Sequence, residues 1–429
     1  MRVGFRCLFA SCIALVGLAV DIGAAGAAAS PQLRGSTERA SVTSAGGQAN
    51  AASSGPTAVS GDGAIIAFSS AATDLVRDGV AGLYVRDRVR LLTQFIAPDG
   101  RSPSLSYQGR FVAFTSSAPN IVTGVTGTQV YVRDRRTGAT VLASVAPDGS
   151  PGNAASDHAS ISADGHLVAF ASKATNLDPG HARQQVVFVR DLTSQSTSTV
   201  APGASPDTWM EEPAISGDGT TLVYTSHSQP ERCLGYEASA IQVTRVGQAT
   251  SRTVGCGSGP SLSSDGLTVG FLPPWRLPDG PQAGCVAGFV VVNRRTGQQQ
   301  TVGSAGAGQG VLSADGHHVL TLDCPNPGIG LLSGPNPSFP LLTVPGTGSG
   351  ETISETYLDY QGTSATGQGN WVATFGSSST GYGLLNLAVS ADGRVASYES
   401  DADTLVTGDT NQAPDIFANV AGILDPQPQ

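Results

Sequence analysis

Residues 160–172 read Ser-Ile-Ser-Ala-Asp-Gly-His-Leu-Val-Ala-Phe-Ala-Ser, and much of the chain repeats this pattern. An Asp-Gly pair between two extended apolar runs is a strong signal for a β-hairpin, because glycine supplies the positive φ that a tight turn requires. Aspartate and serine side chains in such turns bond to their own backbone. We therefore interpret the recurring carboxylate as structural rather than catalytic.

The Ser-x-Asp-Gly tetrapeptide recurs along the chain. Copies begin at Ser60, Ser162, Ser216, Ser263, Ser313 and Ser390, and a variant, Ser-Tyr-Gln-Gly, begins at Ser106. From Gly63 to Gly316, the final glycines of successive copies are 46 to 56 residues apart, a period typical of propellers and solenoids. Each turn is followed by a second β-type run, such as Ile65–Phe68. A third strand, such as Val130–Val132, and a fourth, such as Thr140–Ala143, come after it. The repeat is therefore a four-stranded antiparallel unit, and the fold class is all-β.

These residues resemble the WD40-like repeats of the TolB-type β-propeller family, whose signature is S-x-D-G-x-x-(I/V/L)-A-F-x-S. The resemblance covers roughly residues 36–420 and implies a single β-propeller, followed by a short tail at 421–429. It implies the fold and no particular activity. The sequence shows neither the separate α/β domain of TolB nor the G-x-S-x-G elbow of hydrolases that carry similar propellers.

The spacing of the copies predicts seven or eight four-stranded blades. Gly316 and Gly393 are 77 residues apart, which is too long for one period and too short for two ordinary ones. A degenerate copy, Thr366-Gly367-Gln368-Gly369, lies between them and precedes the apolar run Trp371–Phe375. This segment favours eight blades, one of them reduced.

The two ends of the repeat region predict how the ring closes. The last repeat ends after Asp415–Val420 without a fourth strand, whereas Glu38–Val42 matches the fourth strand of another repeat at Thr140–Val145. We expect the amino-terminal strand to complete the carboxy-terminal blade, because this pairing covers two sheet edges that would otherwise be open to aggregation.

The amino terminus reads as a secretory signal peptide over residues 1–29. Arg2 and Arg6 precede an apolar run from Cys7 to Val20, and small residues suited to signal cleavage follow. A retained membrane anchor is the alternative, but about 14 apolar residues are too few to span a bilayer. A lipoprotein signal at Cys12 is a second alternative, but the apolar run before this cysteine is very short. We expect a secreted or cell-envelope, extracytoplasmic protein without a membrane span.

Composition argues against several partner classes. The chain carries 23 Lys and Arg residues against 33 Asp and Glu, for a net charge of −10, and charged residues make up only 13% of the sequence. A nucleic-acid-binding surface requires a basic face, so we expect no nucleic-acid partner. We also expect a monomer and no cofactor, since no P-loop or dinucleotide-binding fingerprint is present.

Four cysteines follow the signal segment: Cys233, Cys256, Cys285 and Cys324. An even number in an oxidising compartment favours two disulfides, and the absence of a C-x-x-C pair argues against zinc. Cys233 precedes the third strand of its repeat and Cys256 follows the fourth, so antiparallel pairing brings the two together. Among three connectivities we favour Cys233–Cys256 with Cys285–Cys324.

One face of the expected propeller carries the candidate binding residues. Its long loops hold aromatic and charged side chains: Trp209, Glu211, Glu212, Tyr236, Trp275 and Arg276. Such residues on a rigid scaffold suit a binding site, and the alternative is that they pack the loops onto the blades. His158 and Glu212 also fall four residues before a turn serine, at a position whose residue type varies between repeats. This position is expected to ring the channel mouth.

Asp409, Asn411 and Asp415 form a candidate calcium loop, because their alternate oxygen ligands resemble the opening of an EF-hand loop. The glycine and the bidentate glutamate of that loop are missing. An Asx-turn loop without a metal is therefore the alternative.

These features predict an exported, non-catalytic β-propeller that recognises a protein or a glycan through its loop-rich face. Two other functions stay open. One is a carbohydrate-active enzyme, a lyase or a glycosidase, with carboxylates and His158 at the channel mouth. The other is a structural component of the cell envelope.

Overall fold

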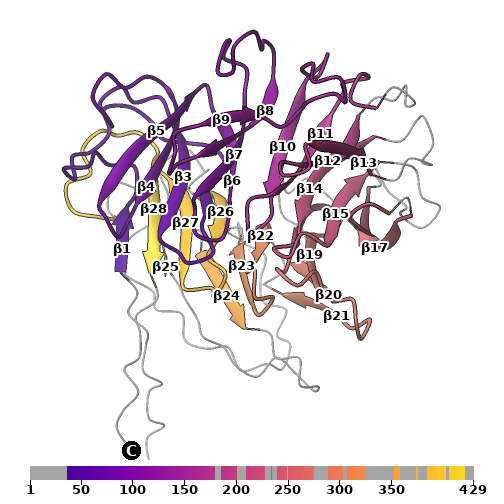
Figure 1. Cartoon of the computed structure of the whole chain (residues 1–429). Coiled ribbons are helices and arrows are strands. Elements are labelled where there is room, and N and C mark those ends of the chain that lie inside the picture. The colour runs from indigo at the N-terminus through magenta and orange to yellow at the C-terminus, as the bar shows by residue number, and fades with distance from the viewer. Residues whose placement is uncertain are drawn as a thin grey trace, which may run out of the picture.

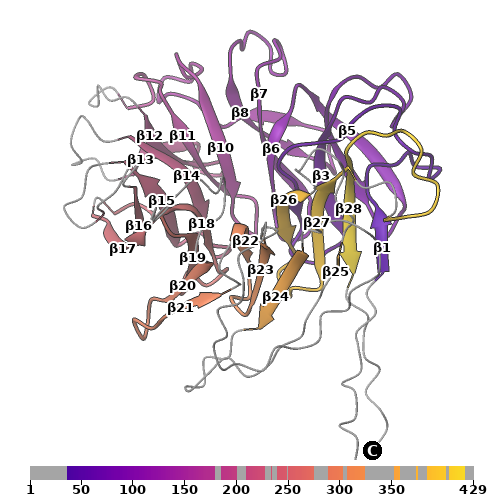
Figure 2. The same ribbon diagram turned by 180° about the vertical axis from the view of Figure 1, so that it is seen from behind.

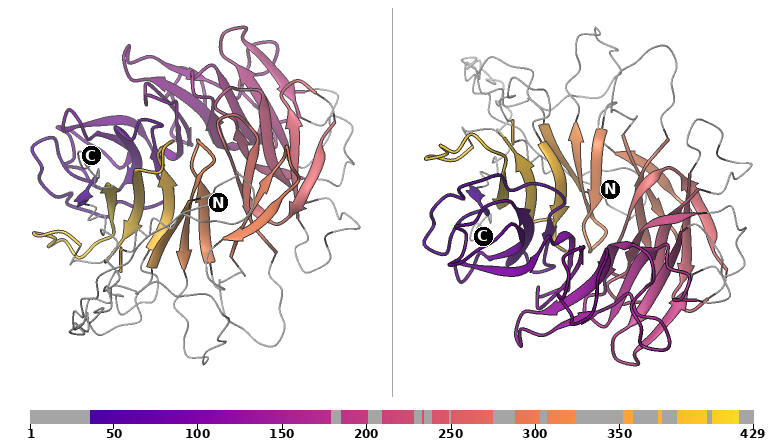
Figure 3. Two further views of the ribbon diagram at one scale, coloured as in Figure 1. Left: turned by 90° about the horizontal axis from the view of Figure 1, so that it is seen from below. Right: turned by 90° about the horizontal axis from the view of Figure 1, so that it is seen from above.

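The computed structural model describes residues 36–178, 185–200, 209–227, 233, 239–248, 250–274, 288–302, 307–323, 352–357, 373–374, 384–401 and 405–420. These residues form strands, turns and loops, with no helix among them. No helix long and apolar enough to cross a membrane therefore occurs in the described part of the chain. The sheets surround a central axis (Figure 1, Figure 2), and Figure 3 shows this ring from its two ends. The chain is an all-β propeller of four-stranded blades.

The described residues form seven four-stranded antiparallel sheets, which we number as blades 1 to 7 in chain order. Blade 1 contains β2 (Ala58–Val59), β3 (Ile65–Ser70), β4 (Gly82–Asp87) and β5 (Leu92–Pro98). Blade 2 contains β6 (Arg101–Leu105), β7 (Phe111–Ser116), β8 (Gln129–Asp134) and β9 (Thr140–Leu142). Blade 3 contains β10 (Ser156–Ile161), β11 (Leu167–Ser172), β12 (Val186–Asp191) and β13 (Ser196–Thr199).

The remaining blades follow the same order of strands. Blade 4 contains β14 (Met210–Ile215), β15 (Thr221–Ser226), β16 (Ala240–Arg245) and β17 (Arg252–Cys256). Blade 5 contains β18 (Ser258–Leu262), β19 (Thr268–Leu272), β20 (Phe289–Asn293) and β21 (Gln299–Val302). Blade 6 contains β22 (Ala307–Leu312), β23 (His318–Asp323), β24 (Thr352–Tyr357) and β25 (Ala373–Thr374). Blade 7 contains β26 (Leu384–Val389), β27 (Val395–Ser400), β28 (Asp415–Val420) and β1 (Ser36–Arg39).

The strand nearest the amino terminus, β1, is the outermost strand of blade 7. It pairs antiparallel with β28, with Ser36 opposite Val420 and Arg39 opposite Phe417. Figure 1 shows the indigo β1 beside the yellow β28. The two ends of the repeat region therefore meet in one sheet.

The segment that was expected to supply an eighth, reduced blade belongs to blade 6. Within Trp371–Phe375, residues Ala373–Thr374 form β25 and pair with β24 as the outermost strand of that blade. No eighth sheet occurs among the described residues. The preference for eight blades is wrong, because an apolar run does not itself specify which strand it will pair with.

The hydrophobic core lies within and between the blades and repeats with them. Six of the second strands carry an aromatic residue eight positions after the turn serine: Phe68, Phe114, Phe170, Tyr224, Phe271 and Tyr398. Each of these side chains is at most 2% exposed. Phe114 stacks on Tyr131 of the third strand, with ring centroids 5.6 Å apart. Burying one such ring stabilises the fold by roughly 1.5–3 kcal/mol. The six rings belong to five separate hydrophobic clusters, so the core is divided among the blades.

Each Ser-x-Asp-Gly turn is held by its own side chains. In blade 3, Ser162 Oγ donates to Asp164 Oδ1 (2.6 Å), which also accepts the backbone N–H of His166 (2.9 Å). Ser162 Oγ in turn accepts the N–H of Leu167 (3.0 Å). The same serine-to-aspartate bond recurs in the turns that begin at Ser60, Ser216, Ser263, Ser313 and Ser390. The structural interpretation of the recurring aspartate is confirmed.

Backbone hydrogen bonds join the seven turns into a closed cycle. Each turn donates one N–H to a carbonyl of the next: Asp62 to Tyr107, Tyr107 to Ala163, Ala163 to Gly217, Asp218 to Ser264, Ser264 to Ala314, Asp315 to Ala391, and Ala391 to Gly61. The donor–acceptor distances lie between 2.6 and 3.2 Å. Because the last turn bonds to the first, none of them lies at an end.

The turn glycine also permits close contact between blades. Gly165 has a φ of 79°, and a Cβ at this position would lie 2.2 Å from the ring of Phe111 in blade 2. A Cβ at Gly393 would lie 2.3 Å from His318 of blade 6. Glycine is therefore required both by the turn and by the neighbouring blade.

We expect Gly165→Ala to lower the free energy of unfolding by about 1–3 kcal/mol more than Gly138→Ala, the usual cost of overpacking. Both glycines have a left-handed φ, 79° and 76°, so the backbone strain is matched. Only Gly165 faces another blade at short range, whereas the nearest atom to a Cβ at Gly138 is 3.8 Å away. Urea denaturation measures both variants, and equal midpoints would contradict the role of the inter-blade contact.

The pairing of β1 with β28 predicts unequal effects of two truncations. A chain that begins at residue 46 lacks β1 and leaves the edge of β28 unpaired, so it should melt well below a chain that begins at residue 36. Deletion of residues 421–429 removes no strand of blade 7 and should leave the melting temperature nearly unchanged. Circular dichroism during heating tests this, and coincident melting of all three proteins would show that β1 contributes little.

Candidate functional site

Five inner strands contain a residue with a left-handed backbone four positions before the turn serine or its equivalent: Ser102 (φ 49°), His158 (52°), Glu212 (50°), Gly259 (60°) and Asn386 (62°). The pairing register shifts at each of these places, as at a β-bulge. A bulge bends its strand and re-aims a side chain, and non-glycine residues with positive φ concentrate at functional sites. The bulges lie toward the ends of the strands opposite the Asp-Gly turns, where the repeat predicts the channel mouth.

Two glutamates brace neighbouring blades at this end. Glu212 Oε2 accepts hydrogen bonds from Thr225 Oγ1 (2.9 Å) and from the N–H of Gly259 in blade 5 (2.8 Å). Glu399 Oε2 accepts the Asn386 amide (2.8 Å) and a backbone N–H from the segment that leads into blade 1 (2.8 Å). Glu212, expected as a binding residue, therefore also holds two blades together.

His158, in β10, lies among carboxylates. Its Nδ1 is 2.9 Å from Asp157 Oδ1, and its side chain is 47% exposed. The hydrogen bond with Asp157 raises the pKa of His158, as do the negative charges of Asp157, Glu212 and Glu211, while burial opposes them. The ring is therefore more often a cation near neutral pH than an ordinary histidine is.

Trp209 directly precedes β14 and stands at the same end of blade 4. Its ring centroid is 4.6 Å from that of His227, and its carbonyl accepts the N–H of His227 at 2.9 Å. His227 Nε2 contacts Glu211 Oε1. Trp209 is 41% exposed and is the largest side chain among the exposed hydrophobic residues of the described chain.

Blades 3 and 4 thus bring together an exposed aromatic ring and two histidine–carboxylate pairs. The inner strands β10 and β14 are in contact, and the charges of Glu211 and Glu212 act on His158. An indole face can pack on an apolar ring, and carboxylates accept hydrogen bonds from hydroxyl or ammonium groups. The arrangement is suited to an amphipathic ligand that has both.

The structure brings together four of the predicted binding residues: His158, Trp209, Glu211 and Glu212. The other three lie outside the described residues: Tyr236, Trp275 and Arg276. Sequence reasoning missed Asp157 and His227. Asp157 could have been found as the carboxylate next to the varied bulge position, whereas His227 reaches Trp209 only because Met210 pairs with Ser226.

The cysteine prediction is tested for one of its two pairs. Cys233 and Cys256 form a disulfide with Cα atoms 5.7 Å apart, which confirms this pair. The bond ties the segment before β16 to the end of β17. Cys285 and Cys324 lie outside the described residues.

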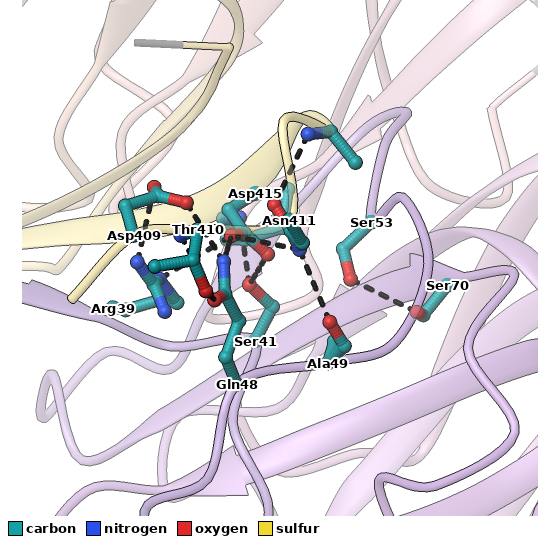
Figure 4. Close-up of polar contacts among 12 residues, drawn as sticks. Arg39, Ser41, Gln48, Ala49, Ser53, Ser70, Asp409, Thr410, Asn411 and Asp415 are labelled. Atoms are coloured by element: carbon teal, nitrogen blue, oxygen red, sulfur yellow. Dashed lines mark hydrogen bonds and ion pairs between the residues drawn. The ribbon is translucent and has the colours of Figure 1, made fainter. Parts of the chain in front are cut away.

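Asp409 and Asp415 are held by the amino-terminal segment (Figure 4). Arg39 Nη2 lies 3.0 Å from Asp409 Oδ2, and Arg39 Nε lies 3.3 Å from Asp415 Oδ2. Ser41 Oγ donates to Asp415 Oδ1 (2.7 Å), and Gln48 Nε2 donates to Asp409 Oδ1 (2.7 Å). A guanidinium therefore occupies the place that the calcium hypothesis assigns to a metal ion. No group of three or more His, Cys, Asp or Glu suited to a metal occurs among the described residues.

The same network joins the two ends of the repeat region. Asn411 Nδ2 donates to the carbonyl of Ala49 at 3.1 Å, so a third residue of the calcium hypothesis also bonds to the amino-terminal segment. Burial raises the pKa of Asp415, while its bonds with Ser41 and Gln48 and the charge of Arg39 oppose this effect. The cluster supports the pairing of β1 with β28.

We expect the His158 ring to titrate above the ordinary value of about 6.5. Asp157→Asn should lower its pKa more than Glu211→Gln does, because Asp157 supplies both a direct hydrogen bond and a charge. By linkage, the protonated ring contributes stability that is present below about pH 6.5 and is lost as the pH rises through the raised pKa of the folded state. An NMR titration measures the pKa, and a value unaffected by Asp157→Asn would contradict the contact.

Comparison with solved structures supports the propeller fold. An oligogalacturonate lyase from Vibrio parahaemolyticus is similar with a TM-score of 0.54 and 10% identity, over 91% of this chain and 97% of its own. The β-propeller domain of the Trilobed protease from Pyrococcus furiosus is similar with a TM-score of 0.52 and 10% identity, over 86% of this chain and 94% of its own. At these identities the likeness concerns the fold alone. The propeller implied by the TolB-type repeats is confirmed.

Two TolB structures are also similar to parts of the chain. TolB from Acinetobacter baumannii has 14% identity and a TM-score of 0.38 over 64% of this chain. The putative TolB from Agrobacterium tumefaciens has 14% identity and a TM-score of 0.35 over 48% of this chain. The chain spans 56% of the first protein and 66% of the second. No family model and no curated protein matches the sequence.

Proposed function

We propose that this protein is an exported, non-catalytic β-propeller that binds a glycan at its channel mouth. The observation that carries the proposal is Trp209, a residue that is 41% exposed and lies beside the pair formed by His227 and Glu211. A sugar ring has an apolar face that packs on an aromatic side chain, and its hydroxyl groups donate to carboxylates. A protein ligand is the other outcome that the experiment below distinguishes.

The scaffold supports binding without large rearrangement. We infer that the seven blades form one ring that β1 closes, and the bond between Glu212 and Gly259 joins blades 4 and 5 at the mouth. A site held in place before binding loses little conformational freedom when a ligand arrives. Rigid blades with a varied mouth therefore suit a binding protein.

The proposed location is outside the cytoplasm. The disulfide between Cys233 and Cys256 supports it, because such bonds persist in oxidising compartments. The predicted signal peptide at residues 1–29 points the same way. We expect a monomer at this location.

A carbohydrate-active enzyme is the second candidate, and the two histidine–carboxylate pairs favour it. His158 with Asp157 and His227 with Glu211 each place an imidazole against a carboxylate. A carboxylate orients a histidine for proton transfer, which is the step that a lyase requires. Glycoside hydrolysis would instead need two carboxyl groups on either side of the bond to be cleaved.

We expect Trp209→Ala to abolish glycan binding while leaving the melting temperature nearly unchanged, because the ring is exposed and lies outside the strands. Binding is measured on a panel of cell-envelope and plant-type polysaccharides by affinity electrophoresis. Tyr107→Ala is the control, since it removes an aromatic ring of similar exposure, 48%, from an Asp-Gly-type turn at the opposite end.

The same panel separates the other functions. New reducing ends or unsaturated products would favour the enzyme, and loss of these products in His158→Gln would assign the catalysis to the mouth. Retention of glycan binding in Trp209→Ala, or capture of a protein alone, would rule out the proposed glycan site.

A further inference from the structure

A groove on the outer rim separates blades 4 and 5. It has a volume of about 430 Å³ and lies between β16 and β17 of blade 4 and the outer strands of blade 5. Its walls include three arginines, Arg245, Arg252 and Arg294, together with Thr253 and Gln299. Arg245 lies at the end of β16 near the Asp-Gly turn, since the next residue donates its N–H to the carbonyl of residue 220 in that turn. The groove is therefore distant from Trp209, which stands at the other end of blade 4.

Arg245 and Arg252 line the same groove as Arg294, and their positive charges act on it. Burial lowers the pKa of Arg294, and the positive charges of Arg245 and Arg252 lower it further. Asp265 has the opposite effect on Arg294, but its Oδ1 already accepts hydrogen bonds inside its own turn. Among the described residues, no carboxylate forms an ion pair with any of the three.

Two other blades carry an arginine at the position of Arg294, and each of these arginines has an oxygen acceptor on the preceding blade. Arg88 of blade 1 and Arg135 of blade 2 are the equivalents of Arg294, because each directly follows the third strand and donates to the carbonyl of its turn glycine. Arg88 also pairs with Glu38 on the outer strand of the preceding blade. Arg135 likewise donates to Gln94 Oε1 on the preceding blade, at 2.8 Å.

In blade 4, a cation occupies the position of these acceptors. Arg252 stands opposite the third strand at the same register as Glu38 and Gln94, two residues before that strand ends. The last residue of the third strand is also changed. It is aspartate in blades 1 to 3, at Asp87, Asp134 and Asp191, and it is Arg245 in blade 4. Blade 4 therefore carries arginine at two positions, 245 and 252, where the blades compared carry side chains with oxygen acceptors. Both arginines lie on the blade 4 side of the groove.

Packing does not require this exchange. Like charges at close range lower stability, and the same ring is built without them between blades 7 and 1 and between blades 1 and 2. Guanidinium groups form paired hydrogen bonds with carboxylate, sulfate and phosphate oxygens. The amide of Gln299 can donate to the same oxygens. In a chain with a net charge of −10, a local cluster of three cations is a specific feature of this groove.

We propose that the groove between blades 4 and 5 binds an oxyanion, a phosphate, sulfate or carboxylate group, held by Arg245, Arg252 and Arg294. The anion is either free or carried on an acidic glycan. The bound anion would supply the negative charge that Glu38 provides for Arg88 at the equivalent place between blades 7 and 1. It does not rest on the glycan site at Trp209.

The test restores the residues that the other blades use. In the double variant Arg245→Asp, Arg252→Gln, the groove acquires the aspartate of blades 1 to 3 and the glutamine of blade 1. Isothermal titration at low salt, with inorganic phosphate, sodium sulfate and a uronic-acid oligosaccharide in separate arms, should show binding to the natural protein. The double variant should bind at least about tenfold more weakly, because it loses two charge-assisted contacts. Without anion it should melt at a higher temperature, since the repulsion is removed.

The matched control changes the net charge equally at distant sites. Arg136→Asp with Arg77→Gln alters two exposed arginines on blades 2 and 1 and should bind as the natural protein does. Phosphate or sulfate binding indicates a free anion, and binding of the oligosaccharide alone indicates an acidic glycan. Absence of binding in all arms, or an equal loss in the control, would overturn the proposal. If the double variant fails to fold, Arg252→Gln alone decides between the same outcomes.

Discussion

Hydrogen bonds between neighbouring Asp-Gly turns are the constraint on which the rest of the structure depends. A turn in an open row would leave a backbone N–H at one end and a carbonyl at the other without a partner, and buried or crowded backbone groups rarely stay unpaired. The cycle from Asp62 back to Gly61 through all seven turns avoids this. It also obliges the first and last blades to be neighbours. The pairing of β1 with β28 and the ion pairs of Arg39 are how the chain meets that obligation.

Local chemistry made the turns predictable, and pairing made other features unpredictable. Ser-x-Asp-Gly satisfies its own hydrogen bonds within five residues, so the sequence alone identifies it, and the antiparallel repeat was enough to pair Cys233 with Cys256. The β-type run at Trp371–Phe375 carries no such local signal. Whether it forms an inner or an outer strand depends on a partner elsewhere in the chain, and β24 provides that partner.

The candidate site was predictable in position but not in role. The repeat identifies the position of His158 and Glu212, because every turn serine marks the same register. For Glu212 the role depends on a neighbouring blade, because its carboxylate bonds to Gly259. The bond of Glu212 to Gly259 joins two repeats and is not encoded within one, whereas the contact of Asp157 with His158 is local to β10. The contact of Trp209 with His227 similarly requires the pairing of two strands.

Seven copies of one unit also provide comparisons within a single molecule. Where every blade solves the same packing problem in the same way, as with the turn glycines, the residue is explained by the fold. A departure that the fold does not require needs another explanation. Arg88 and Arg135 have partners on the preceding blade that accept their hydrogen bonds, whereas Arg294 shares its groove with the cations Arg245 and Arg252. Like charges at close range lower stability, and the oxyanion that we propose for the groove would account for them, because guanidinium groups form paired hydrogen bonds with such groups.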